Sequence, residues 1–277
     1  MWATHWKSLL RSKDFFLAFT FCTAFMVIAT LGTILQKYGA YSASLAPAWY
    51  YFGYAGSAYN NILKTALGPF AIFILPFAGP VAYGWSYYAH QKSNLLPLLV
   101  ARKSRSSYFL SGAATVFLAG FLVIFIPLLI SELLVCLAVP LDSLKILPEW
   151  PTHDYHHIRE TFGRGLAMNM PYLYYFIYTL IPAAFSGLLT VLGYGISLFF
   201  HKNRFLVVTI PGILYIAGSF LIGILSRRLG AMPYMVIMPP SGSGDIYLSD
   251  IIILFGTVLA ADVILAAAKL LFKRDEL

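Results

Sequence analysis

The sequence predicts an all-α polytopic membrane protein with six transmembrane helices, and three observations carry this prediction. The 277-residue chain is 60% hydrophobic and only 11% charged, whereas soluble domains contain about 25% charged residues. Its apolar residues lie in runs of about 20 residues or more, the length that a helix needs to cross a hydrocarbon core about 30 Å thick. Basic residues gather at the ends of these runs, as topology determinants do.

Six segments meet the length requirement for a membrane span. Because lipid offers the backbone no hydrogen-bond partners, each segment is expected to be helical. The expected spans cover about residues 15–36, 67–89, 109–138, 174–200, 206–226 and 250–272. They leave outer loops at 37–66, 139–173 and 227–249, and residues 1–277 are interpreted as one transmembrane domain.

Lys and Arg residues predict the orientation of these spans. The segments on the side of the two chain ends contain twelve of the 19 Lys and Arg residues, and the loops on the other side contain seven. Because positively charged segments stay in the cytoplasm, both termini are predicted to be cytoplasmic. Membrane topology therefore explains the net charge of +8, which gives no reason to expect nucleic acid as a partner.

The first fourteen residues, MWATHWKSLLRSKD, form a short amphipathic pattern. Four apolar residues fall near one helix face and two basic residues lie off it: Trp2, Trp6, Leu9 and Leu10 against Lys7 and Arg11. A helix of this kind lies in the membrane interface, with its tryptophans at headgroup depth. The pattern therefore predicts an in-plane helix; the alternative is a capped start of the first span.

A basic, proline-marked segment, QKSNLLPLLVARKSRSSY at residues 91–108, joins the second and third spans. Its apolar part is too short to cross a membrane, and Pro97 suits the first turn of a short helix. Basic residues follow, and Tyr108 stands at the interface before the third span. The segment predicts a short amphipathic cytoplasmic helix with a basic turn. A basic anchor that happens to include leucines is the alternative.

This layout resembles the permease subunit of the ABC-2 class of ATP-binding-cassette exporters. The resemblance covers nearly the whole chain by architecture: an N-terminal in-plane helix, six spans, cytoplasmic termini and a coupling helix between spans two and three. In the segment 91–108 the matching residues are Leu95, Leu96, Leu98, Leu99, Arg102, Ser104, Arg105, Tyr108 and Phe109. The family's segment often begins with acidic residues, whereas this chain has Gln91, Lys92, Ser93 and Asn94 there.

The resemblance implies a transporter subunit that couples to a separate ATPase. The implied coupling residues are Leu95, Leu96, Leu98, Leu99, Arg102, Arg105 and Tyr108. The chain has no GxxxxGK[ST] phosphate-binding loop, so it is not expected to be an enzyme or to hold a cofactor. Two ATPase subunits, with ATP and Mg²⁺, and a second permease subunit, identical or paralogous, are the implied partners. The implied activity is outward transport of a peptide, lipid or hydrophobic drug across a bacterial plasma membrane.

Two acidic residues fall inside predicted spans. Glu132 lies in the outer half of the third span, and Asp262 lies in the middle of the sixth. Ionisable groups at this depth are costly and usually face a bundle interior or a cavity. Each is therefore a candidate for the transport pathway. The alternative is a structural acid that is hydrogen-bonded to another helix, or one that reaches the outer interface in the case of Glu132.

Prolines fall inside four of the six runs: Pro76 and Pro80 in the second, Pro127 in the third, Pro182 in the fourth and Pro211 in the fifth. They predict kinks, because proline removes a backbone donor and clashes with the preceding turn. Membrane helices also tolerate proline without any functional role.

The outer loop 139–173 contains the stretch THDYHH, with His153, His156 and His157. Its spacing matches no structural zinc class, and no cysteine joins it, so no metal site is predicted. Two alternatives to a transporter remain open. A multispan membrane enzyme would use the acids or these histidines, and a non-transporting immunity or sensor protein would need no ATPase.

Overall fold

The computed structural model describes residues 2–39, 47–52, 62–93, 105–141, 162–199, 203–226, 232–238 and 246–272. Within these ranges every regular element is helical, and none is a β-strand. The predicted fold class, an all-α polytopic membrane protein, is confirmed.

Six helices in the described part of the chain are long and apolar enough to cross a membrane. They cover Lys13–Tyr38, Ile62–Lys92, Ser107–Ala138, Pro171–Ser197, Arg204–Leu225 and Leu248–Lys269. Each coincides with one predicted span, with ends that differ by a few residues. The chain is therefore a multi-pass membrane protein by the length and composition of its helices.

Five of these spans are single α-helices: α2 (Lys13–Gly39), α7 (Arg105–Ala138), α10 (Pro171–Ser197), α11 (Arg204–Ser226) and α13 (Leu248–Phe272). Pro127, Pro182 and Pro211 lie inside α7, α10 and α11, which continue as α-helices through them. Proline at these positions therefore does not divide the span.

The second span is built differently, from a succession of short pieces. It runs through α3 (Ile62–Pro69), η2 (Phe70–Ile74), α4 (Leu75–Gly79), η3 (Pro80–Gly84) and α5 (Ser86–Lys92). The pieces η2 and η3 are π-helical turns that stand directly before and after α4. Because Pro76 and Pro80 have no backbone N–H, the regular α-helical ladder cannot pass through them unchanged. A π-turn re-pairs the freed carbonyls locally.

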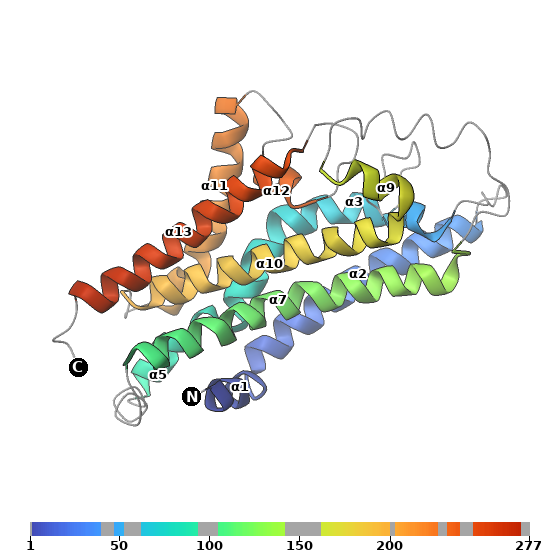
Figure 1. The fold of residues 1–277 in the computed structure, drawn as a ribbon. Coiled ribbons are helices and arrows are strands. Elements are labelled where there is room, and N and C mark those ends of the chain that lie inside the picture. Colours follow the sequence, from blue (N-terminus) through green and yellow to red (C-terminus); the bar gives the residue numbers. More distant parts are fainter. Residues whose placement is uncertain are drawn as a thin grey trace.

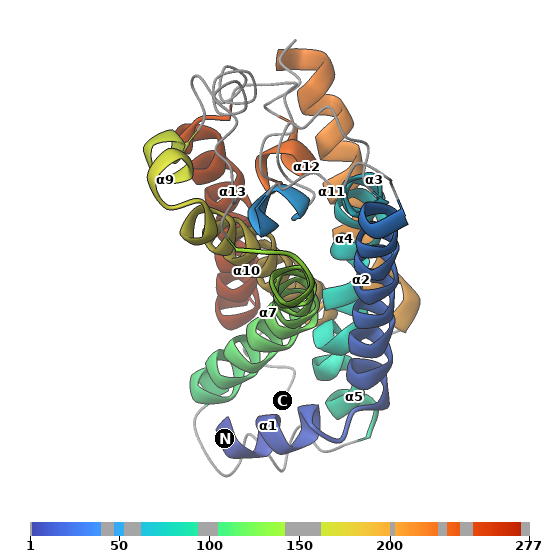
Figure 2. The ribbon, with the colours of Figure 1, turned by 90° about the vertical axis from the view of Figure 1, so that its right-hand side faces the viewer.

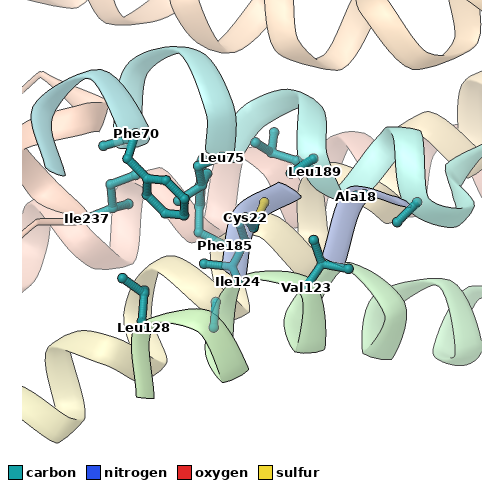
Figure 3. Close-up of a cluster of buried hydrophobic side chains, with 14 of the residues drawn as sticks. Ala18, Cys22, Phe70, Leu75, Val123, Ile124, Leu128, Phe185, Leu189 and Ile237 are labelled. Carbon is teal, nitrogen blue, oxygen red and sulfur yellow. The ribbon is translucent and has the colours of Figure 1, made fainter. Parts of the chain in front are cut away.

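Helix α10 lies at the centre of the bundle (Figure 1). In its most apolar stretch 61% of the residues are buried, against 6% for α13, which presents most of its surface outward. Side chains from α2, the second span, α7 and α10 meet in one hydrophobic cluster, in which Ile237 also takes part. Figure 3 shows this cluster, with Cys22, Phe70, Ile124 and Phe185 pointing toward one another.

Two glycines allow three spans to approach closely at Thr190 of α10. A Cβ atom at Gly79 would lie 2.1 Å from the Thr190 Oγ1 atom, and a Cβ at Gly120 of α7 would lie 2.0 Å from it. The Thr190 hydroxyl donates a hydrogen bond of 2.7 Å to the carbonyl of Ser186, so its polar group is satisfied within its own helix. Close backbone approach at small residues is a main source of helix association in membranes.

The first helix, α1 (Trp2–Leu9), lies across one end of the bundle at a steep angle to α2 (Figure 2). The C-terminal end of α13 lies at this same end (Figure 1). The buried residues of α1 are His5 and Leu9, whereas Trp2 and Leu10 are almost half exposed. The predicted separate N-terminal helix is present, and it packs on the bundle through His5 and Leu9, while Trp2 on the predicted interfacial face stays exposed.

We predict that Gly120→Ala destabilises the protein by about 1–3 kcal/mol, because the added methyl group overlaps Thr190 at a crossing that cannot spread. Gly218→Ala is the matched control, since nothing lies within 4 Å of a Cβ at Gly218. Thermal unfolding in detergent measures both variants. Equal midpoints for the two variants would contradict a tight crossing at Gly120.

Candidate functional site

The segment that carries the predicted coupling residues is only partly described. Leu95, Leu96, Leu98, Leu99 and Arg102 lie outside the described residues, and Arg105 is described only as the first residue of α7. Tyr108 is the one predicted coupling residue whose side chain is described, and it is fully buried. The surroundings of the segment are therefore described from the residues at its two ends, 90–93 and 105–108.

Three side chains from three elements meet at the two ends of this segment. The hydroxyl of Tyr108 in α7 lies 2.7 Å from Nδ1 of His90 in α5, a hydrogen bond. The ring of His5 in α1 packs on both, with centroids 5.0 Å from Tyr108 and 5.7 Å from His90. Helix α1 is thereby attached to His90, which directly precedes the segment 91–108, and to Tyr108, the last residue of the segment.

Tyrosines surround this cluster, which we call the His5 cluster (His5, His90 and Tyr108). The hydroxyl of Tyr83 donates a hydrogen bond of 3.4 Å to the backbone carbonyl of His5. The hydroxyl of Tyr194 in α10 is buried and has no hydrogen-bond partner among the described residues. A Cβ atom at Gly112 would come within 2.5 Å of that hydroxyl and 3.6 Å of His5 Cε1. Gly112 therefore makes the space in which α1 reaches the bundle.

His5 is held in its neutral form. Its side chain is only 3% exposed, and burial, with smaller contributions from His90 and the chain's amino terminus, lowers its pKa from 6.5 to about 4. A protonated His5 would have to be desolvated beside a second imidazole, and no carboxylate takes part in the described cluster. Charge on His5 therefore opposes the docking of α1.

We predict that stability falls as the pH is lowered from about 6.5 to about 4, because the unfolded chain then binds a proton that the folded His5 does not. The stability that depends on neutral His5 is fully present above pH 6.5, and its loss at low pH amounts to about 3 kcal/mol at most. Thermal unfolding in detergent as a function of pH measures it. His5→Phe should flatten this part of the profile, whereas Lys7→Gln on the same helix should leave it unchanged.

Glu132 lies between α7 and α10 toward the other end of the bundle. The hydroxyl of Thr179 is within hydrogen-bond distance of a carboxyl oxygen of Glu132 and of the carbonyl of Tyr175. A threonine hydroxyl donates one proton, so both contacts are satisfied together when Glu132 is protonated and donates to Thr179. The partner on another helix favours the structural interpretation of Glu132 over an acid that reaches the outer interface.

We predict that Glu132→Gln changes stability by less than about 1 kcal/mol, because an amide N–H can replace the carboxylic O–H as donor to Thr179. Glu132→Ala should cost about 1–3 kcal/mol, since it removes the hydrogen bond between α7 and α10 and leaves a cavity in place of the side chain. Thermal unfolding of both variants in the same detergent tests this. A glutamine variant as unstable as the alanine variant would indicate that Glu132 is charged.

Asp262 has a different environment. It is 7% exposed, on the face of α13 that packs against α10, and neither carboxyl oxygen has a hydrogen-bond partner in the part of the chain that the structure describes. The surrounding contacts fix its position: Phe255 packs on Phe185 at 5.6 Å, and Leu265 packs beside Gly195. The hydrogen-bonded structural role considered for Asp262 therefore has no support in the described residues, and Asp262 remains a candidate pathway residue.

An aromatic cap covers the end of the bundle opposite α1. Trp49 and Tyr51 belong to η1 (Ala48–Tyr51), and Trp49 stacks on Tyr175 of α10 at 6.4 Å. Phe52 packs edge-on against the same tyrosine at 5.5 Å. Backbone hydrogen bonds join the loops beneath it, from Ala48 N to Pro140 O and from Phe162 N to Ile246 O.

The remaining small helices in the described part of the chain are α9 (Arg164–Asn169) and α12 (Pro233–Val236).

The described residues contain no group of three or more His, Cys, Asp or Glu side chains that could hold a metal ion. His153, His156 and His157 lie outside the described residues. The two acids are also far apart along the bundle, since Glu132 pairs with Thr179 near the start of α10 and Asp262 lies beside its C-terminal half.

Comparison with known proteins does not assign the chain to a family. No family model, no curated protein and no solved structure matches the chain.

Sequence reasoning missed His5 and His90 as a pair, because they are 85 positions apart and neither has a motif around it. One local signal was available for His5. It precedes Leu9 by four residues, so both lie on one helix face, and that face is the buried one.

Proposed function

We propose that this protein is the membrane subunit of an exporter driven by a separate ATPase, of the ABC-2 type. The segment 91–108 contains the proposed docking helix, and the chain moves an amphipathic peptide, lipid or hydrophobic drug outward. Both termini and the segment 91–108 face the cytoplasm in this proposal. Two ATPase subunits bind there, with ATP and Mg²⁺, and a second permease subunit completes the pathway.

The His5 cluster is the observation that supports this function best. A segment that transmits force from a partner needs firm attachment at both ends, since a loose linker would absorb the movement. Here His90 at one end is hydrogen-bonded to Tyr108 at the other, and His5 fastens both to α1. Tyr87 and Phe109 extend this contact, with rings 5.7 Å apart, toward Tyr194 of the central helix. Movement of the segment would therefore reach α10.

Two further features agree with a transport pathway. The buried carboxyl group of Asp262 in the sixth span has no hydrogen-bond partner within the described ranges, and the second span contains two π-turns that interrupt its α-helical hydrogen-bond pattern. Irregular helices and buried acids are common where membrane helices rearrange around a substrate.

Co-purification tests the proposal. The chain, tagged at its C-terminus, is extracted from native membranes in mild detergent, and bound proteins are identified by mass spectrometry. We expect a P-loop ATPase to be recovered with the native chain. Leu98→Asp should lower its recovery about tenfold or more, because a buried unpaired charge in an interface costs several kcal/mol.

Leu10→Asp is the matched control, since it makes the same change at an exposed leucine at the same end of the bundle, outside the segment. Gel filtration and thermal unfolding establish that both variants remain folded. A folded native chain that recovers no ATPase would refute the exporter. Equal losses with Leu98→Asp and Leu10→Asp would refute the assignment of the segment 91–108 as the contact.

A further inference from the structure

A cavity of about 830 Å³ opens beside α1, between this helix, the start of α2 and α5. Its lining contains three cationic side chains, Lys7, Arg11 and Lys13, together with hydroxyl groups such as those of Ser8 and Ser12. The cavity lies at the end of the bundle, where the membrane-crossing part of α2 begins. It is therefore placed at the depth of lipid headgroups.

The charges of this cavity are unbalanced. Its lining contains one carboxylate, Asp14, and that group is already paired with Arg204 at 2.7 Å. The Arg204 guanidinium is also held over the ring of Trp85 at 3.7 Å, which fixes the pair at the cavity wall. None of the three cationic side chains has a carboxylate partner among the described residues. An anionic group in the cavity would complete the charge balance.

An apolar groove of about 570 Å³ continues from this cavity along α2, and the two share Arg11 and Lys13. Below these cations its lining follows one exposed face of the helix, at helical spacing: Phe16, Leu17, Thr20, Phe21 and Ala24. From Lys13 to Ala24 the helix rises eleven residues, about 16 Å at 1.5 Å per residue. One leaflet of a bilayer contributes about 15 Å of hydrocarbon.

We infer that the cavity and the groove together bind one anionic phospholipid of the adjacent leaflet. Its phosphate lies among Lys7, Arg11 and Lys13, and one acyl chain lies along Phe16, Leu17 and Phe21. A free phosphate could satisfy the cations, but it would leave the groove without an occupant; only a lipid has both parts in the right order. The site is independent of the proposed exporter function, since it needs no ATPase and no substrate.

Native mass spectrometry of the full chain in detergent tests this inference. The probes are phosphatidylglycerol and phosphatidylcholine with identical 16:0 and 18:1 chains, and inorganic phosphate as competitor. We expect one tightly bound phosphatidylglycerol, about tenfold weaker binding of phosphatidylcholine and no competition by phosphate at millimolar concentration. Arg11→Gln should weaken phosphatidylglycerol binding about fivefold, the effect of one cation near an anionic headgroup.

Matched variants distinguish a specific lipid site from the non-specific attraction of basic residues to anionic lipid. Lys92→Gln removes an exposed cation at the same end, outside the cavity, and should leave binding unchanged. Ala24→Phe obstructs the groove and should weaken binding, whereas Ala260→Phe, on the exposed face of α13, should not.

Three outcomes would overturn the inference: equal effects of Arg11→Gln and Lys92→Gln, equal binding of the two lipids, or displacement of the lipid by inorganic phosphate. The last would reassign the cavity to a soluble anion. Thermal unfolding of each variant without added lipid separates a loss of binding from a loss of folding.

Discussion

The close crossing of three spans at Thr190 is the contact on which the remaining architecture depends. Gly79 and Gly120 have no side chains, so the second span and α7 both approach the same hydroxyl of α10. In a membrane there is little hydrophobic gain from bringing helices together, and packing at small residues takes its place. Because α10 is fixed from two sides here, its two ends can present side chains at defined positions.

Each end of α10 takes part in a different environment. Near its C-terminal end Tyr194 stands among the tyrosines that surround the His5 cluster, at the same end of the bundle as both described chain ends. Near its N-terminal end Thr179 and Tyr175 meet Glu132 and the aromatic cap. A shift of α10 along its axis would disturb both environments at once. This connection is what makes the chain suitable for transmitting movement across a membrane in the proposed function.

Helix α1 connects two features that are otherwise separate. Its buried face places His5 against His90 and Tyr108, at the two ends of the segment 91–108, and its outer face contributes Lys7 to the proposed lipid site. A lipid bound there would contact α1, the same short helix that packs on both ends of the segment 91–108. An ion pair between Arg204 and Asp14 also connects this region to α11, since Arg204 is at the start of α11 and Asp14 is at the start of α2.

The sequence by itself determined the fold class, the six spans and the separate N-terminal helix, because run length and charge position are local properties that the bilayer imposes on any chain. It also identified Glu132 and Asp262 as unusual, since an acid in an apolar run is visible without a structure. The tertiary structure decided which neighbours each acid has, because Thr179 is 47 residues from Glu132 and no spacing rule connects them. It likewise decided the meeting of His5, His90 and Tyr108 and the crossing at Thr190. These depend on which helix faces pack together, and a uniformly apolar helix such as α7 does not reveal its buried face in its sequence.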